Sequence, residues 1–216
     1  MSTLVVVRTN PTRSWRGVSA EERRVERHAQ LVEAGLEVIG THGWANTTVR
    51  GVCRRAGLTE RYFYESFLDR EALLVAVYER VLGEGIRVVL EAISAAPKDF
   101  RLTVRAAITA GVELLTDDPR KGRVLALEAM TNEALQRRRR EAMQAQAELI
   151  SQLAREVFCA DAPEPTDANL TAFALIGMLV ELGGAYLDGR LDVSRERLIE
   201  HLTELVIAAA TVSSSA

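Results

Sequence analysis

The chain has few cysteines, few prolines and few aromatic residues for its length. Only two of its 216 residues are cysteine, Cys53 and Cys159, and they lie far apart without a CxxC pair. This spacing argues against a disulfide framework or a thiolate metal site, and it fits a protein of the reducing cytoplasm. Five prolines and 14 glycines are too few for a low-complexity chain. We therefore expect a globular protein with a buried core.

The sequence also lacks a long uninterrupted hydrophobic run. Residues 168–187 are the most apolar stretch, but Glu181 and the pair Gly183 and Gly184 interrupt it. A membrane-spanning helix needs about 20 mostly apolar residues, and a charge inside such a helix is costly. The N-terminus shows no signal-peptide pattern, since four apolar residues follow no basic segment. We expect a cytoplasmic protein without a membrane partner, in which residues 168–187 pack in a protein interface.

Positive charge is concentrated towards the N-terminus. The net charge is −3 overall, but residues 1–80 contain 12 arginines against 10 acidic residues. The first 18 residues hold three of these arginines and no acidic residue, and they show no hydrophobic periodicity. We expect residues 1–18 to form a flexible basic arm. A part of the protein that approaches an anionic polymer is expected at this end of the chain.

Helical periodicity begins directly after this arm. Ser19 and Glu22 have the spacing of a capping box at a helix start. An apolar stripe follows at steps of three and four residues and ends near Gly43, where a left-handed cap is expected. The stripe consists of Val25, Ala29, Val32, Leu36 and Ile39.

Two short helices are predicted next, joined by a tight turn. The first is capped by Thr47 and ends at Gly57, and the second is capped by Thr59. Such a pair has the form of a helix-turn-helix. Asp69 then caps a longer helix that reaches past residue 90.

The remainder of the chain is also helical in pattern. Helices are predicted over 99–116, 119–130, 132–158, 167–188 and 194–211, and no segment alternates with a period of two. The expected fold is all-α with about nine helices. We divide it into the arm 1–18, a helix-turn-helix domain 19–66 and a larger helical domain 67–216.

Four of the eleven aromatic residues lie within positions 62–67. Phe63 and Phe67 are one helical turn apart and share a face, which we expect to close the core of this small unit. Tyr62 and Tyr64 are turned by about 100° to either side, so their hydroxyls stay available. Such side chains suit phosphates and base edges, which present acceptor atoms.

The segment 43–74, GWANTTVRGVCRRAGLTERYFYESFLDREALL, resembles the DNA-binding domain of the TetR family of transcriptional regulators. The shared features come in one order and cover residues 20–80 well, whereas beyond them only the helix count and length are similar. These features are Gly43-Trp44, Thr47-Thr48, Cys53 before Ala56-Gly57, Tyr64-Glu65-Ser66-Phe67 and Arg70-Glu71-Ala72-Leu73.

The resemblance implies that the third helix enters the major groove. It implies base-facing positions at 59–62 and phosphate contacts at 48, 64, 66 and 70. Arginine independently suits either role, because it binds guanine or phosphate with two hydrogen bonds. The family often has Lys, Gly and His where this chain has Glu60, Arg61 and Ser66; Glu60 would accept from cytosine or favour the helix start electrostatically. The candidate DNA-binding residues are Thr47, Thr48, Arg50, Thr59, Glu60, Arg61, Tyr62, Tyr64, Ser66 and Arg70.

The last two predicted helices carry patterns suited to helix packing. Gly177 and Gly184 lie two turns apart on one face, and small residues let helices approach closely. The resemblance implies that these helices pair with their symmetry mates in a homodimer. It also implies that the helices before them surround a pocket for a small-molecule effector. The candidate dimer-interface residues are Gly177, Glu181, Gly184, Leu198, Leu202 and Leu205.

Residues that bind the effector cannot be assigned from the sequence. Glu128, Asn132 and Glu181 are polar residues in apolar surroundings, and ordinary surface exposure is the favoured interpretation of each. No metal or cofactor is expected, because the three histidines have no carboxylate or cysteine partner at ligand spacing.

The leading interpretation is a homodimeric transcriptional repressor that a small molecule releases from a palindromic DNA operator. One alternative is a DNA-binding activator or organiser that responds to no ligand. Another is an all-helical enzyme that uses the C-terminal cavity. The sequence contains no HExxH, ExxH pair or GxSxG motif, so we expect no enzymatic activity.

Overall fold

The computed structural model describes residues 19–129, 132–158 and 164–213. Within these residues the chain forms nine α-helices, one 3₁₀ turn and one π-helical segment, and no β-strand. The all-α prediction is therefore confirmed. The proposed basic arm and Cys159 lie outside the described residues.

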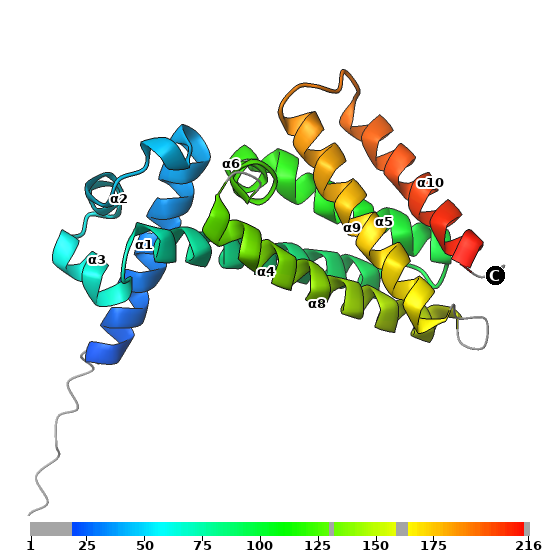
Figure 1. Ribbon diagram of the computed structural model, residues 1–216, viewed down its shortest axis with the longest axis horizontal. Helices are drawn as coiled ribbons and strands as arrows, with labels where there is room; N and C mark the ends of the chain where they lie inside the picture. The colour runs from blue at the N-terminus through cyan, green and yellow to red at the C-terminus, as the bar shows by residue number, and fades with distance from the viewer. Residues whose placement is uncertain (1–18, 130–131, 159–163, 214–216) are drawn as a thin grey trace, which may run out of the picture.

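The N-terminal unit consists of three helices and a short turn. They are α1 (Ala20–His42), η1 (Trp44–Asn46), α2 (Val49–Ala56) and α3 (Glu60–Ser66). The capping box is present at the start of α1, where Ser19 and Glu22 each bond the other's backbone N–H. Figure 1 shows these three helices at the left of the molecule, apart from most of the later helices.

The later helices form a bundle that α4 joins to the N-terminal unit (Figure 1). In this bundle α8 packs extensively on α9, and α10 packs on α5 and α9. The elements are α4 (Arg70–Ala95), α5 (Phe100–Asp117), α6 (Pro119–Gly122), the π-helical segment η2 (Arg123–Glu128), α8 (Glu133–Phe158), α9 (Pro165–Leu187) and α10 (Arg195–Ser213).

The largest apolar core joins the N-terminal unit to the first part of α4. Phe63 and Val52 are fully buried in it beside Leu36 of α1 and Leu73 of α4. Residues from η2 and the start of α8 close the same core. The start of α4 is therefore held against α1 by buried side chains. Because such a core is closely packed, a displacement of α4 would also move side chains of the N-terminal unit.

Two smaller cores lie in the bundle. One is formed by α5, α9 and α10 around Ile108 and Leu202, and the other by α8 and α9 around Ala147 and Ile176. Neither of these clusters shares a buried residue with the large core.

The first helix differs from its predicted pattern in two ways. Val25 is 61% exposed and Ala29 is also exposed, so the buried face begins only at Leu31. No other described residue covers Val25 or Ala29 in the first turns of α1. Gly43 ends the helix with φ 79° and ψ 161°, which is a positive φ but not the left-handed helical conformation expected.

Candidate nucleic-acid interface

The helix α3 has one buried face and one exposed polar face. Phe63 is fully buried and Phe67 is 6% exposed, whereas Tyr64 is 59% exposed. The two phenylalanines anchor α3 in the core, and this directs Glu60, Arg61 and Tyr64 to solvent. The aromatic cluster thus divides between core and surface as its helical spacing predicts.

A tight turn fixes α3 relative to α2. Gly57 has φ 68° and ψ 24°, a left-handed conformation that glycine adopts without steric cost. The N–H of Leu58 donates to the carbonyl of Cys53 at 3.0 Å. Thr59 is the N-cap of α3, but its hydroxyl makes no capping hydrogen bond and lies at the exposed start of the helix.

A charged cluster fixes side chains on the exposed face of α3. The Nε of Arg61 donates to Oε1 of Glu65 at 3.0 Å, and Nη2 of Arg27 lies 3.7 Å from Oε2 of the same carboxylate. The guanidinium of Arg27 also lies over the ring of Tyr62, 4.5 Å from its centroid. Arg27, which comes from α1, therefore connects the first helix to the exposed face of α3.

The start of α2 uses its two threonines differently. Thr48 is exposed and its Oγ1 accepts from the N–H of Gly51 at 3.0 Å. Thr47 is fully buried and its hydroxyl donates to the carbonyl of Gly43 at 2.9 Å. Thr48 rather than Thr47 is the helix cap, which corrects the expected start of α2. The side chain of Thr47 cannot reach DNA, because it is enclosed in the core and bonded internally.

The side chain of Arg70, at the start of α4, makes contacts within the protein. Its guanidinium lies over the ring of Trp44, 4.0 Å from the centroid, and its Nη1 donates to the carbonyl of Thr47 at 2.5 Å. These contacts connect α4 with the segment that enters α2.

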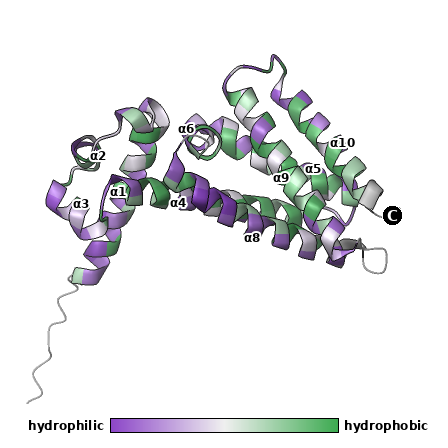
Figure 2. Ribbon diagram, viewed as in Figure 1, coloured by the Kyte–Doolittle hydropathy of each residue, from purple (hydrophilic) through white to green (hydrophobic). Residues whose placement is uncertain are grey.

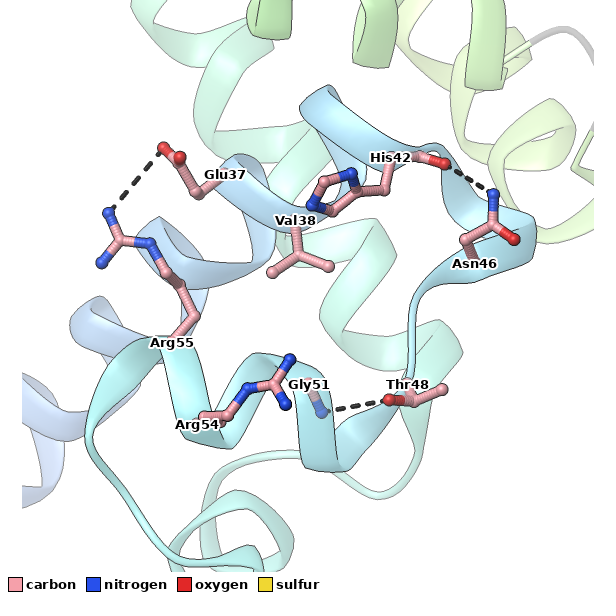
Figure 3. A pocket seen from close by; sticks show the side chains of 8 residues that line it. All are labelled: Glu37, Val38, His42, Asn46, Thr48, Gly51, Arg54 and Arg55. Atoms are coloured by element: carbon pink, nitrogen blue, oxygen red, sulfur yellow. Dashed lines mark hydrogen bonds and ion pairs between the residues drawn. The ribbon is translucent and has the colours of Figure 1, made fainter.

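A groove of about 460 Å³ lies between the end of α1 and α2. Figure 3 shows Arg54 and Arg55 along one side of it and Glu37 with His42 on the other. A carboxylate oxygen of Glu37 lies 3.9 Å from Nη2 of Arg55. Two guanidiniums and one carboxylate thus line the groove, which leaves a small excess of positive charge beside the exposed cap of α2.

Most of the predicted DNA-binding residues come together on one part of the molecule. Thr48 and Arg50 are exposed at the start of α2, and Ser66 is half-buried at the end of α3. The prediction missed Arg27, Trp44 and Glu65 as residues that organise this surface. The i to i+4 spacing of Arg61 and Glu65 could have indicated their pair, but no sequence signal indicates the contacts made by Arg27.

The short helix α6 lies between the N-terminal unit and α9. Arg120 of α6 is paired with Glu37 of α1 and with Asp118. A side chain at Gly40 of α1 would collide with Arg120, and one at Gly122 of α6 would collide with Leu187 of α9. The helix α6 is therefore in close contact with both α1 and α9.

Ion pairing shifts the pKa of both partners at this junction. Hydrogen bonds from Arg120 lower the pKa of Asp118, and the bonds to Asp118 and Glu37 raise the pKa of the Arg120 guanidinium. Lys121 of α6 also binds Glu84 of α4, with Nζ 2.7 Å from Oε1. The junction is held by charged contacts at physiological pH.

The predicted dimer-interface residues separate into buried and exposed groups. Leu198 and Leu202 pack inside the protomer against α5, and Gly184 is buried against Ala126 of η2. These three residues do not form an outer face, which corrects that part of the prediction. Leu205 is half-buried. Gly177 and Glu181 lie on the open side of α9 together with Leu170 and Ala174.

The polar residues considered for the effector pocket also differ in burial. Glu128 is 8% exposed and its Oε1 accepts from Nε of Arg123 at 3.1 Å, so surface exposure was the wrong interpretation for this residue. Asn132 is half-buried and its Oδ1 accepts from the N–H of Leu135. Glu181 is exposed, as expected.

The helix α9 is the one described helix that is long and apolar enough to cross a membrane. Only 28% of its most apolar window is buried inside the protomer. Figure 2 shows hydrophobic residues along α9 and α10. This apolar surface thus lies partly uncovered in a single chain.

A helix-turn-helix with a buried aromatic anchor and an exposed polar helix defines a DNA-binding protein of the helix-turn-helix class. Residues 31–77 match the family model described as "Bacterial regulatory proteins, tetR family". Residues 31–77 therefore form a DNA-binding domain of the TetR family, and the chain as a whole has the fold of solved TetR-family regulators. No curated protein is significantly similar in sequence.

Solved structures with the same fold cover most of the chain. The fatty acid degradation regulator FadR from Bacillus halodurans is 19% identical, with a TM-score of 0.72 over 83% of this chain and 94% of that one. FadR from Bacillus subtilis, solved in complex with stearoyl-CoA, is 20% identical, with a TM-score of 0.72 over 84% and 98%. A TetR-family transcriptional regulator from Streptomyces coelicolor is 17% identical, with a TM-score of 0.69 over 88% and 83%.

Proposed function

We propose that this protein is a cytoplasmic, homodimeric repressor that binds a palindromic DNA operator and leaves it when a small molecule binds. The observation that carries the proposal is the division of α3 into a buried face, with Phe63 at its centre, and an exposed face of hydrogen-bonding side chains. A helix anchored in this way can enter the major groove without exposing its core.

Base reading is assigned to the exposed face of α3. Arg61 is the strongest candidate, because its side chain is 84% exposed and a guanidinium can bind both acceptors of guanine. Thr59 and Glu60 begin the same exposed face, and Tyr62 lies at its margin under Arg27. These four residues are the proposed source of sequence preference.

Phosphate contacts are assigned to residues around this face. Thr48 and Arg50 lie at the start of α2, where the helix dipole favours an anion. Tyr64 presents a phenolic O–H from α3, and Ser66 and Arg70 lie between α3 and α4. Such contacts position a protein on DNA but carry little sequence information.

The open face of α9 is the proposed dimer interface. Leu170, Ala174, Gly177 and Glu181 follow one another at steps of four, three and four residues, so they share this face. A side chain at Gly177 would meet no atom of the described residues of its own protomer within 4 Å. A second copy can therefore approach closely there, with the half-buried Leu205 of α10 added to the interface.

The effector site is proposed to lie among the helices of the bundle. The two small cores of the bundle are separate from the large core, and the second half of α4 carries half-exposed apolar residues such as Ile86 and Val89. This arrangement suits an apolar ligand. Because stearoyl-CoA is present in the FadR structure from Bacillus subtilis, a long acyl-CoA is the first ligand to test.

The junction at α6 supplies a route from this site to DNA. A displaced α9 would push Gly122, and α6 would then move Arg120 against Gly40 and Glu37 of α1. The ligand changes DNA affinity only if it binds the two arrangements of α6 and α9 with different affinity.

We assign residues 19–66 to the DNA-binding unit and residues 67–216 to the effector and dimerisation unit.

The test is a titration of the purified full chain against the DNA that flanks its own gene. A scrambled duplex of the same length is the comparison, at two salt concentrations, with and without stearoyl-CoA. The proposal predicts tighter binding to a flanking duplex, weakened by salt, and its loss on adding a ligand. Equal binding to both duplexes contradicts DNA reading, and an unchanged titration with stearoyl-CoA rules out that effector.

A further inference from the structure

The exposed face of α3 carries more negative than positive charge. Its outward side chains include the carboxylates of Glu60 and Glu65 but only one guanidinium, that of Arg61. DNA presents a dense row of phosphates, so the side chains of α3 by themselves add little general attraction for DNA, which is left to arginines of other helices such as Arg27 and Arg54. Sequence preference on such a surface depends on contacts that overcome this repulsion.

Glu65 lies at the centre of the charges on this face. Its Oε1 accepts from Nε of Arg61 at 3.0 Å, and its Oε2 lies 3.7 Å from Nη2 of Arg27. Arg27 is in turn fixed over Tyr62. One carboxylate, 37% exposed, thus interacts with two arginines, and through one of them with a tyrosine of the same face.

The pair of Arg61 and Glu65 is strong enough to orient Arg61 but weak enough to break. Surface ion pairs one helical turn apart contribute little to stability and are screened by salt. A guanine offers two acceptors to a guanidinium and can replace the carboxylate. A single phosphate oxygen offers one acceptor in place of two, and its negative charge must also approach the carboxylate of Glu65.

We propose that Glu65 is a specificity-determining residue. Its carboxylate binds Arg61 and disfavours contacts of Arg61 with phosphates, and only a guanine that takes the place of the carboxylate on the guanidinium breaks this pair. This inference rests on the proposed DNA-binding function. In this role the negative charge of Glu65 lowers the affinity of the protein for DNA of arbitrary sequence. The same carboxylate keeps Arg27 over Tyr62, which makes Glu65 a positioning residue as well.

The experiment compares the full-length wild type with Glu65→Gln, which removes the charge and keeps the size. Binding is measured by fluorescence anisotropy on the preferred flanking duplex and on its scrambled version, at several salt concentrations. On the scrambled duplex we expect affinity to rise about two- to fivefold, the scale of one surface ion pair. The logarithmic salt slope there should steepen by about 0.9, as for one further phosphate contact.

The affinity of Glu65→Gln for the preferred duplex should rise less than its affinity for the scrambled duplex. The ratio of the preferred to the scrambled affinity should therefore fall. Glu91→Gln is the matched control, because Arg87 and Glu91 form an exposed pair with the same spacing on α4, with Nη1 2.8 Å from Oε2. It should leave the ratio unchanged. Glu65→Asp keeps the charge and should stay closer to the wild-type ratio than Glu65→Gln does.

Two results would overturn the inference. One is an unchanged affinity of Glu65→Gln for both duplexes, and the other is a change by the same factor on both. A wild type that binds both duplexes equally would instead contradict the proposed function, and this inference with it. The unfolding temperature of each variant separates these outcomes from a loss of folding.

Discussion

The guanidinium of Arg70 lies over the ring of Trp44, 4.0 Å from its centroid, and also donates to the carbonyl of Thr47. The contact joins the first turn of α4 to the segment before α2, over a sequence separation of more than 20 residues. Arg70 thus holds the starts of α2 and α4 in a fixed relation.

The first prediction concerns this contact. Arg70→Ala should lower the free energy of unfolding by about 1–2 kcal/mol, because a cation–π contact and a hydrogen bond are lost. Arg70→Lys keeps the charge but loses the planar stacking group, and it should also weaken DNA binding. Thermal unfolding and duplex titration measure both effects. If Lys restores full DNA affinity, Arg70 acts as a simple phosphate contact instead.

The second prediction separates the two kinds of aromatic residue on α3. Phe63→Ala should destabilise the protein by about 3–5 kcal/mol, since a fully buried ring is removed. Tyr64→Phe removes only an exposed hydroxyl and should change stability by less than about 0.5 kcal/mol, while weakening DNA binding. Urea unfolding followed by circular dichroism gives the stabilities. A large loss of stability in Tyr64→Phe would show that its hydroxyl is structural.

The third prediction concerns the dimer. Gly177→Arg should give monomers, because the new side chain would occupy the open face of α9 without disturbing its own protomer. Gly83→Arg is the control, because Gly83 lies on α4 and a side chain there would also meet no atom of the described part of the chain within 4 Å. Light scattering coupled to size exclusion gives the mass of each variant. A Gly177→Arg protein that remains dimeric places the interface elsewhere.

The fourth prediction is a pH dependence at the α6 junction. Arg120 lowers the pKa of Asp118 below its ordinary value of 3.8. A lowered folded-state pKa stabilises the protein above the unfolded-state value, and this stabilisation is lost as pH falls through the folded-state value. Asp118→Asn should therefore unfold at a lower temperature than wild type at neutral pH, and the difference should shrink below about pH 4.

Thermal unfolding of both proteins across this pH range measures the effect. Asp192→Asn, at an exposed position between α9 and α10, controls for the loss of one carboxylate. A constant difference between Asp118→Asn and wild type at every pH would show that the ion pair with Arg120 contributes nothing.

The fold could be predicted closely from the sequence because its signals are local. Helix starts such as Ser19 and Asp69 carry capping side chains, and both caps are present. The turn at Gly57 was likewise evident, since glycine is favoured where φ is positive. Helix periodicity then gave the remaining elements within a few residues.

The contacts between helices could not be predicted, because they depend on tertiary packing. Leu198 and Leu202 form an apolar stripe that fits an external interface or an internal one equally well, and the structure places them inside. Arg27 is one of three arginines in α1, and only the position of α3 in the fold determines which of them contacts it. Thr47 and Thr48 are adjacent and identical, yet one is buried and the other exposed.

We propose that α3 reads DNA sequence through Arg61. The affinity of Arg61→Ala for the preferred and the scrambled duplex tests this role most directly. On the preferred flanking duplex the loss should be about 1–3 kcal/mol, the value of a bidentate contact with guanine. On the scrambled duplex it should be clearly smaller. Equal losses on both duplexes would contradict base reading by Arg61 and assign it to the phosphate backbone.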